Sequence, residues 1–372
     1  MSPPDGHSNP TPIAWFGPHL TGGEIGRLRD VLDRQYINDG PLAREFERRI
    51  AAIVGTRHAV AVSSGTAAIA LALMAAGIGA GDEVLVPDLT FAATANAVRL
   101  TGASVKLVDV EPVRFGVDPD AVGAAIGPNT RALVTVDVNG RGADYRRLEC
   151  ICRDSGLVLI CDAAEALGSR YAGRMLGSFG LAGCFSFSAN KTITAGQGGI
   201  VTTNDDAVHD RLRELKDQGR RHGGTGGDDL HPVIGFNFKF TDLQAAVALA
   251  QLDALEQRLA AAVRRDNLYA ERLANQPGLS LPPYSEPGEV RQWTDVLIEN
   301  RAGVCAALDA AKIGHRAFWL PLHRQAPYAA DERKFPHSTD ISRRGLWLAS
   351  RFDLSEADFD RIGSVIVAAL RR

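Results

Sequence analysis

The feature that most constrains this chain is an alternation of short apolar runs with helical segments between residues 59 and 202. Seven runs of four or five residues are apolar throughout or rich in β-branched side chains, and helical segments separate most of them. Strands that are apolar on both faces are typical of a mostly parallel sheet covered by helices on each side. The runs are Ala59–Val62, Glu83–Pro87, Val105–Asp109, Ala132–Val136, Val158–Cys161, Cys184–Phe187 and Gly199–Thr202.

A second, smaller unit follows this alternation. Thr241 with Gln244 three residues later has the pattern of a capping box, which starts a helix. Apolar spacing continues this helix to about Ala274, and further strand-like and helical runs come after it. The sequence therefore predicts an α/β fold with a large domain over residues 13–245. A long connecting helix and a small C-terminal α/β domain are predicted over residues 246–372.

The seven-stranded sheet is expected to be mostly parallel, with one exception. The last two runs, Cys184–Phe187 and Gly199–Thr202, have no helix between them. A parallel pair needs a crossover of a dozen residues or more, so an antiparallel strand is expected at that edge. The helices expected around the sheet cover residues 24–33, 42–54, 67–76, 92–101, 119–126 and 144–155.

Charge and hydropathy exclude several classes of partner. The net charge is −3 and no basic block is present, which argues against nucleic acid or an anionic membrane as the main partner. No apolar run approaches the ~20 residues of a membrane-spanning helix. Residues 1–12 are polar and proline-rich, and we expect them to be disordered.

The five cysteines do not have the paired spacing of a metal site. Cys150 and Cys152 fall in a predicted helix, and Cys161 and Cys184 fall in strand-like runs. Buried, reduced thiols are therefore expected, with no metal bound. Reduced thiols are typical of a cytoplasmic protein.

The stretch from residue 157 to residue 203 holds the candidate chemistry. An apolar run ends in an acid, Asp162, and a later turn rich in serine, threonine and glycine contains Lys191. Either residue alone is more often a helix cap or a solvated charge. Together they are the parts that a pyridoxal phosphate (PLP) site requires. The lysine amine forms a Schiff base with the cofactor aldehyde, and the acid keeps the ring nitrogen protonated.

Three motifs in this stretch carry a family resemblance. They are Asp-Ala-Ala-Glu-Ala-Leu-Gly (162–168), Phe-Ser-Phe (185–187) and Asn-Lys-Thr-Ile-Thr-Ala-Gly-Gln-Gly-Gly (190–199). From about Pro18 to the C-terminal helix, the sequence resembles the DegT/DnrJ/EryC1/StrS sugar aminotransferases. That family implies the aspartate-aminotransferase-like type I fold of PLP enzymes. The third motif is most similar to the branch that contains GDP-perosamine synthase.

The resemblance implies four ligands of the cofactor phosphate. Gly65 and Thr66 begin an alanine-rich helix, whose N-terminus favours an anion, although these residue types alone would favour a simple helix cap. Ser186 lies between two aromatic residues, so its hydroxyl faces away from them in an extended run. Asn237 resembles a family position that reaches the phosphate in the neighbouring subunit, which implies a homodimer with shared sites. The family usually has arginine two residues later, where this chain has Lys239.

Four further residues are implied around the cofactor ring. Lys191 and Asp162 are the expected catalytic residues, and both also bind the cofactor. Phe91, which composition alone would place in the core, is implied to stack on the ring. Glu165, three residues after Asp162, is implied to contact the ring hydroxyl.

The C-terminal part has candidate substrate-binding residues. His323 lies in the run 319–325, which resembles a substrate-proximal segment of the family, and Tyr328 follows this run. His323 also fits a surface histidine with ordinary partners. Ala349 stands where the family usually has proline, which puts the local turn in doubt. The glycine-rich stretch Gly219–Pro232 fits either a surface connection or a flap near the site.

The expected function is therefore that of a PLP-dependent aminotransferase. It would take the amino group from L-glutamate and deliver it to a nucleotide-linked keto sugar, by resemblance a 4-keto-6-deoxyhexose. Transamination at another sugar position, or of a cyclitol ketone, stays open. A PLP-dependent sugar dehydratase is the next alternative, although the members considered carry histidine where this chain has Lys191. A non-catalytic binding protein with this fold would commonly lack the lysine or the acid.

Overall fold

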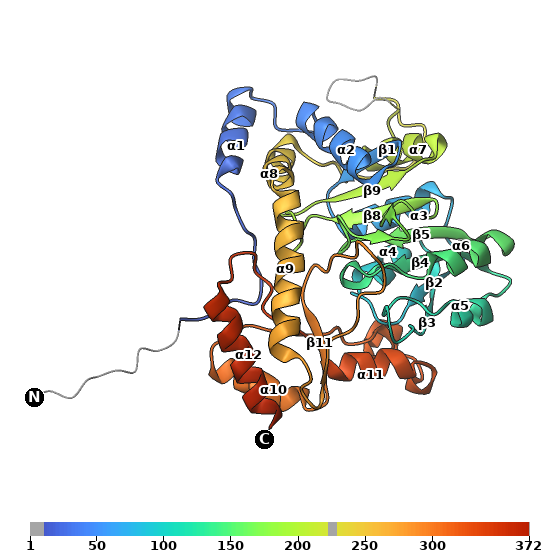
Figure 1. The fold of residues 1–372 in the computed structure, drawn as a ribbon. Helices are drawn as coiled ribbons and strands as arrows, with labels where there is room; N and C mark the ends of the chain where they lie inside the picture. Colours follow the sequence, from blue (N-terminus) through green and yellow to red (C-terminus); the bar gives the residue numbers. More distant parts are fainter. Residues whose placement is uncertain (1–10, 222–228, 372) are drawn as a thin grey trace, which may run out of the picture.

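A seven-stranded sheet is the centre of the computed structural model, which describes residues 11–221 and 229–371 (Figure 1). Ten of the twelve residues expected to be disordered, and the middle of the glycine-rich stretch, lie outside these ranges. The strand order is β1-β9-β8-β5-β4-β2-β3. The bounds are β1 (His58–Val62), β2 (Glu83–Pro87), β3 (Ser104–Val108), β4 (Thr130–Val136), β5 (Val158–Asp162), β8 (Ala182–Ser186) and β9 (Gly199–Thr203).

The direction of the strands confirms the mostly parallel sheet. The pairs β2·β3, β2·β4, β4·β5 and β5·β8 are parallel. The antiparallel strand is β9, which pairs with β8 on one side and with β1 on the other. The expectation of an antiparallel strand was right, but its place at the edge was wrong. The edge strand is β1, because β1, from an earlier part of the chain, pairs with the outer side of β9.

Helices cover both faces of the sheet, as the apolar strands predict. Along β1 the side chains alternate, so Val60 and Val62 join one apolar cluster and Ala59 and Ala61 join the other. The first cluster includes the helices α3 (Gly65–Ala75), α4 (Ala93–Leu100) and α7 (Asp206–Lys216). The second includes α2 (Pro41–Val54), α5 (Pro119–Ala125), α6 (Tyr145–Asp154) and α8 (Asp242–Asp253).

Two helices connect the large domain to the C-terminal part, whereas the sequence predicts a single long helix. The capping box is confirmed, since the Thr241 hydroxyl accepts from the Gln244 N–H and the Gln244 side chain accepts from the Thr241 N–H. However, α8 ends before Ala254, whose ψ of 8° leaves the helical range. The next helix, α9 (Leu255–Leu273), continues close to the same direction, so the two form one column in Figure 1.

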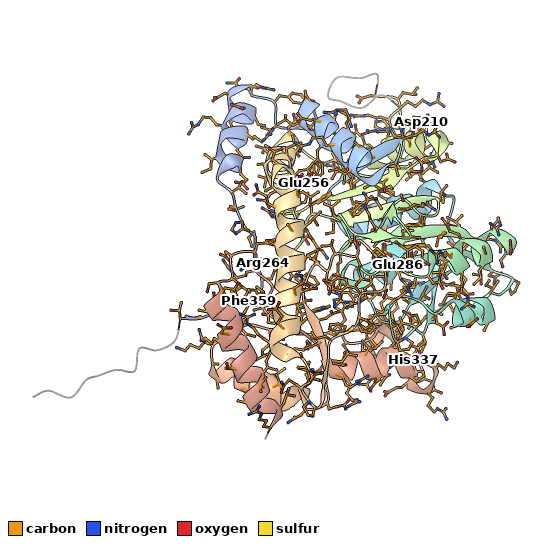
Figure 2. The ribbon with its side chains drawn as sticks, in the orientation of Figure 1. Asp210, Glu256, Arg264, Glu286, His337 and Phe359 are labelled. Carbon is orange, nitrogen blue, oxygen red and sulfur yellow. The ribbon has the colours of Figure 1, made fainter. Side chains whose placement is uncertain are left out.

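A four-stranded antiparallel sheet is the core of the C-terminal part. Its order is β10-β11-β13-β12, and Val296 of β11 and Leu346 of β13 are fully buried. Figure 2 shows Phe359 beside α9, where it meets the ring of Tyr269 edge-on with the centroids 5.0 Å apart. The bounds are β10 (Leu279–Ser280), β11 (Asp295–Ile298), β12 (Arg316–Ala317), β13 (Gly345–Trp347), α10 (Arg301–Ala310), α11 (Pro336–Arg344) and α12 (Glu356–Leu370); α1 (Gly23–Asp33) and the hairpin β6 (Arg170–Tyr171)–β7 (Arg174–Met175) complete the elements.

Buried polar contacts join the two sheets. The Arg141 guanidinium, after β4, donates to both carboxylate oxygens of Asp295 on β11 at 2.6 and 2.7 Å, and both side chains are fully buried. Asp109, after β3, accepts from the backbone N–H groups of His337 and Ser338 at the start of α11. The division at residue 245 stays a prediction, but these contacts fix the small sheet against the carboxyl ends of β3 and β4.

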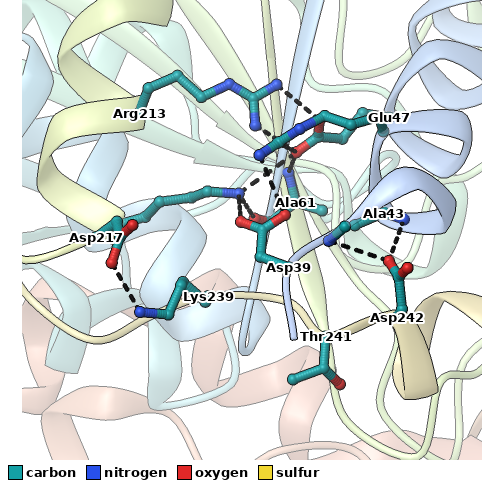
Figure 3. A network of polar contacts seen from close by, with 12 residues as sticks. Asp39, Ala43, Glu47, Ala61, Arg213, Asp217, Lys239, Thr241 and Asp242 are labelled. Atoms are coloured by element: carbon teal, nitrogen blue, oxygen red, sulfur yellow. Dashed lines mark hydrogen bonds and ion pairs between the residues drawn. The ribbon is translucent and has the colours of Figure 1, made fainter. Parts of the chain in front are cut away.

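A buried ionic network ties α2 to α7 beside β1 (Figure 3). The Glu47 carboxylate accepts from both terminal nitrogens of Arg213, at 2.7 and 2.6 Å, and from the Ala61 N–H at 2.8 Å. Lys216, only 2% exposed, contacts Glu47 at 3.5 Å and Asp39 at 2.8 Å. Burial raises the pKa of Glu47, but the Lys216 and Arg213 charges and the hydrogen bonds outweigh it and lower this pKa to about 2.

We predict that Glu47→Gln destabilises the protein by about 3 kcal/mol at pH 7, because a pKa of about 2 lies well below the ordinary carboxyl value. This stability is present above pH 4.5 and is lost as pH falls toward 2. The gap between variant and wild type should therefore shrink by about 1.4 kcal/mol per pH unit below 4.5. Urea unfolding at pH 7 and pH 3.5 measures it, with the half-buried neighbour Glu45→Gln as control. If the difference in free energy of unfolding between wild type and Glu47→Gln does not change with pH, the charge of Glu47 does not stabilise the network.

The cysteines only partly match the expected buried thiols. All five are free, and Cys152, Cys161 and Cys184 are buried, but Cys150 is exposed and Cys305 is half-buried. The expectation was wrong for Cys150 because it lies on the outer face of α6, two residues from the inward-facing Cys152. Within the part of the chain that the structure describes, no helix combines the length and apolar composition that crossing a membrane requires.

Candidate active site

A cavity of about 410 Å³ opens where the carboxyl ends of β2, β4, β5 and β8 meet. This is the usual ligand position in a mostly parallel sheet. Trp293 and Arg316, from the C-terminal part, also line it. Seven of the eight predicted cofactor residues are on its wall, and Asn237 is the exception. The seven are Gly65, Thr66, Phe91, Asp162, Glu165, Ser186 and Lys191.

Asp162 lies at the end of β5, where the β4·β5 register places it opposite Val136. Its Oδ2 accepts from the Thr94 hydroxyl at 2.7 Å, and its Oδ1 accepts from the Ala164 N–H at 3.1 Å. Burial raises the pKa of Asp162 to about 6, although these two hydrogen bonds and the Lys191 charge act in the opposite direction. The carboxylate is thus held rigidly, and a cation placed beside it would make it easier to ionise.

Lys191 lies in the turn between β8 and β9, and its Nζ is 3.2 Å from Oε1 of Glu165. The other oxygen of Glu165 accepts from the Asn139 N–H at 3.0 Å. Nζ also lies 5.4 Å from the centre of the Trp293 ring. An acid and an aromatic face therefore hold the lysine amine at the cavity wall.

Asn139 positions both of these neighbours. Its backbone is left-handed, with φ of 54°, a conformation that asparagine tolerates better than most residues. Its side chain forms two hydrogen bonds with the backbone of Trp293, one to the carbonyl oxygen at 2.6 Å and one from the N–H at 2.8 Å. One residue thus joins the Glu165 carboxylate to the tryptophan that faces Lys191.

The start of α3 and the end of β8 form a narrow polar cradle. Ser64 is the N-cap of α3, and its hydroxyl accepts from the Ala67 N–H. The first N–H groups of a helix have no partner within the helix, so those of Gly65 and Thr66, two residues that line the cavity, are available to a ligand. A Cβ atom on Gly65 would lie only 2.9 Å from Cβ of Ser186. Only glycine lets the helix start approach the serine this closely.

The comparison with protein families agrees with this geometry. Residues 18–367 match the DegT/DnrJ/EryC1/StrS aminotransferase family. The chain belongs to this family. It is 37% identical to the GDP-perosamine synthase of Caulobacter vibrioides over 365 residues, with 94% of this chain and 96% of that protein covered.

Two solved structures of the same fold extend the comparison. DesI, solved in the presence of its TDP-sugar product, is 32% identical with a TM-score of 0.90, covering 99% of this chain and 95% of that chain. The PLP form of the putative sugar aminotransferase Spr1654 from Streptococcus pneumoniae is 25% identical, also with a TM-score of 0.90. That comparison covers 97% of this chain and 99% of the other. This aminotransferase is accordingly PLP-dependent and has the type I fold.

The residues on the cavity wall fit PLP. The Gly65–Ser186 cradle leaves no room for a Cβ atom and presents N–H and hydroxyl donors, which suits a phosphate. The buried Asp162 carboxylate suits a protonated ring nitrogen. Phe91 is 55% exposed on the wall, so its ring face is free for stacking rather than packed in a core.

Asn237 and Lys239 lie away from this cavity wall. Asn237 is exposed and forms an isolated bridge with Asp217. The ammonium of Lys239 pairs with the Asp217 carboxylate at 2.7 Å. Asn237 is thus presented on the surface rather than to its own chain's cavity.

The structure does not bring the two predicted substrate residues to the cavity wall. His323 is 3% exposed, its Nδ1 is 2.6 Å from Oδ2 of Asp88, and its ring stacks on Phe335. It is neither a surface histidine nor a wall residue. The Tyr328 hydroxyl donates to the Asn96 side chain at 2.6 Å.

Several wall residues were missed in the sequence. Thr94 is in the same short run as Phe91. It lies four residues after Thr90, and this helical spacing, which brings the two hydroxyls together, was the signal available in the sequence. Asp137 follows β4 directly; burial raises its pKa to about 7, and its Oδ2 has no partner among the described residues. Trp293 and Arg316 come from separate parts of the small sheet region, and no local pattern marks them.

Proposed function

We propose that this aminotransferase moves the amino group of L-glutamate to a nucleotide-linked keto sugar, specifically a 4-keto-6-deoxyhexose. The observation that carries the proposal is the placement of Lys191 and Asp162 on one cavity wall, in a chain 37% identical to a GDP-perosamine synthase over 365 residues. The likeness to DesI, solved with its TDP-sugar product, supports a nucleotide-linked acceptor.

Each wall residue then has a task. When bound, PLP supplies an electrophilic carbon and a ring that accepts electron density. Gly65, Thr66 and Ser186 bind its phosphate, and the Asp162 carboxylate pairs with the protonated ring nitrogen. Phe91 covers one face of the ring.

Lys191 is the residue that moves protons. Its Nζ takes a proton from Cα of the amino donor, and in the second half-reaction it delivers one to the sugar carbon that gains the amine. Glu165, 3.2 Å from Nζ, orients the amine. Trp293 and Trp319 are only 1% and 9% exposed, and they exclude water from this side of the cavity.

The proposed function is tested by the visible absorption of the PLP-loaded protein before and after L-glutamate. Loss of the band, with one 2-oxoglutarate formed per site, supports the donor assignment. Return of the band on adding GDP-4-keto-6-deoxymannose, with an amino sugar as product, supports the acceptor. A band that responds to glutamate but to no 4-keto sugar would overturn the acceptor and favour another ketone. A band that ignores glutamate would overturn the donor.

We also propose a homodimer in which Asn237 binds the cofactor phosphate of the partner subunit. The support is its exposure on the surface, away from its own cavity. Exposed polar side chains that complete a neighbouring site are consistent with a two-fold interface.

Complementation tests this dimer. Lys191→Ala and Asn237→Ala homodimers should each be inactive at limiting PLP. After mixing and subunit exchange, we expect about a quarter of wild-type activity, because half of the dimers are mixed and each has one intact site. If Asn237 served its own chain, the mixture would stay inactive. The control is a mixture of Lys191→Ala with Lys191→Arg, which offers no intact site in either arrangement.

We propose a cytoplasmic enzyme, because all five cysteines are free and Cys150 is exposed. An exposed thiol persists in reducing compartments. Fractionation of the producing cells checks this, and recovery outside the cytoplasm would contradict it.

A further inference from the structure

Two threonine hydroxyls form a chain that ends on the Asp162 carboxylate. The Thr94 hydroxyl lies 2.7 Å from Oδ2 of Asp162, and the Thr90 hydroxyl lies 2.9 Å from that of Thr94. Both threonines are only 1% exposed, and both line the cavity. The proposed function uses Asp162 but gives Thr90 no task.

The number of protons fixes the direction of this chain. An ionised carboxylate only accepts hydrogen bonds, so the proton between Thr94 and Asp162 belongs to Thr94. A hydroxyl has one proton, so the proton between the two threonines comes from Thr90. Thr90 therefore donates to Thr94, and Thr94 donates to Asp162. Each hydrogen bond in such a chain polarises the next, which strengthens the one that reaches the charge.

Contacts with the C-terminal part hold the segment that carries Thr90. Two residues earlier, Asp88 is fully buried after β2, and its Oδ1 accepts from the His323 N–H at 2.7 Å. The Asp88 carbonyl oxygen accepts from the Leu322 N–H at 2.9 Å. Thr90 is thus fixed next to Thr94 by contacts that do not depend on a ligand.

Asp162 needs support because its surroundings oppose its charge. Burial raises the pKa of Asp162 to about 6, and the nearby charge of Glu165 acts in the same direction. Among the groups that lower this pKa, the Thr94 hydroxyl acts most strongly. Among the described residues, the titratable groups around Asp162 are Asp137, Cys184, Glu165 and Lys191. A change at Thr90 or Thr94 leaves all four in place.

We propose that Thr90 is a positioning residue of the active site, which acts through Thr94 to orient the Asp162 carboxylate and to stabilise its negative charge. The inference deepens the proposed function, since it rests on Asp162 as the partner of the ring nitrogen. Thr90 needs no contact with the reacting atoms for this role. The hydroxyl chain favours a charged acid in a place where burial disfavours one.

The first test titrates the Asp162 carboxyl in the full chain before PLP is added, by infrared difference spectra against Asp162→Asn. Thr94→Val should make this carboxyl hold its proton about 10- to 100-fold more tightly, because a hydrogen bond to a charged group is lost. Thr90→Val should act in the same direction by about two- to fivefold, because only the polarisation of that bond is lost. Thr90→Ser, which keeps the hydroxyl, should titrate like wild type.

The double variant separates the hydroxyl chain from independent packing. Since Thr90 acts through Thr94, Thr90→Val should change nothing further in a Thr94→Val background. Thr202→Val is the matched control, because the buried Thr202 hydroxyl donates to the Gly177 carbonyl oxygen at 2.7 Å and the residue does not line the cavity. It should lower the thermal unfolding midpoint without moving the Asp162 titration. If Thr90→Val titrates like wild type, or if its effect adds in full to that of Thr94→Val, the inference is overturned.

PLP binding distinguishes this role from a general defect of the site. In the Lys191→Ala background, Thr90→Val should weaken PLP binding by about two- to fivefold at pH 5.5 and leave Kd unchanged at pH 9. The reason is that a more tightly held proton competes with the ring nitrogen only below the pKa of Asp162. An equal loss at both pH values would overturn the inference. If Asp162→Asn binds PLP as tightly as its parent at every pH, the proposed pairing with the ring is contradicted, while the infrared titration still decides the role of Thr90.

Discussion

Lys191→Ala is expected to reduce amino transfer by at least about 1,000-fold, because it removes the amine that moves protons at the reacting carbon. The purified variant should also lose the visible absorption band that PLP gives when joined to a lysine. The cavity itself should survive, since the Lys191 side chain is 12% exposed at the wall and its main contact is the Glu165 carboxylate. Steady-state rates and the absorption spectrum measure both effects.

Two comparisons make this result specific. Lys334→Ala removes an exposed lysine that does not line the cavity and should keep both the rate and the band. Glu165→Gln keeps the shape of the acid beside Nζ but removes its charge, and we expect a smaller loss of rate with the band retained. Full activity in Lys191→Ala would show that another group carries the chemistry.

The repeating part of the fold was predictable from the sequence because burial acts on each strand separately. All seven predicted strands exist, and β2 has the predicted bounds, Glu83–Pro87. Each is apolar because helices cover both faces, so the signal is local. The order of the strands is not local, and the place of β9 between β8 and β1 depends on pairing across more than a hundred residues.

The break between α8 and α9 shows a limit of helical spacing. The apolar positions continue through Ala254, so the pattern predicts one helix. In the structure the Arg258 side chain, one turn later, reaches back to the carbonyl oxygens of Thr192 and His19. That contact comes from distant parts of the chain, and periodicity does not record it.

The candidate site was also predictable only where the signal is local. Gly65 lies at a helix start, Asp162 at a strand end and Lys191 in the turn after β8, each within a recognisable motif, and the topology brings them to one cavity. Asn139 and Arg316 belong to no such motif, and their importance comes from contacts with Trp293 and Trp347. A motif can assign chemistry to a residue, but the neighbours that orient it come from tertiary structure.

His323 shows how tertiary contacts can differ from those that a motif suggests. Its segment pointed to the substrate, yet the side chain lies in the interior against Asp88 and Phe335. Burial raises the pKa of Asp88, although the His323 hydrogen bonds oppose that effect. The pair joins the end of β2 to the C-terminal part, so a role in positioning that segment is the one its contacts support.

Asp162→Asn should weaken PLP binding by about 100-fold near pH 7.5, because it removes the carboxylate that pairs with the charged ring nitrogen. The comparison is best made in the Lys191→Ala background, where binding is noncovalent and equilibrium dialysis gives the Kd. Thr94→Val is the related variant, since it removes the hydroxyl that donates to Oδ2 of Asp162 at 2.7 Å. We expect it to weaken binding less, because the carboxylate and its Ala164 hydrogen bond remain.

The pH dependence then identifies the carboxylate itself. With the Lys191 charge nearby, burial raises the pKa of Asp162 to about 6, and in the Lys191→Ala background, where that charge is absent, the pKa is higher still. Below this pKa a proton must leave before the ring nitrogen can pair. The advantage of the Asp162 carboxylate over the neutral amide of the Asp162→Asn variant should therefore be constant well above the pKa of Asp162 and shrink by about tenfold per pH unit below it. Protonation of the cofactor phosphate affects both proteins equally and cancels in the ratio of their Kd values. A ratio that does not change between pH 7.5 and pH 5 would mean that Asp162 is not the group that pairs with the ring.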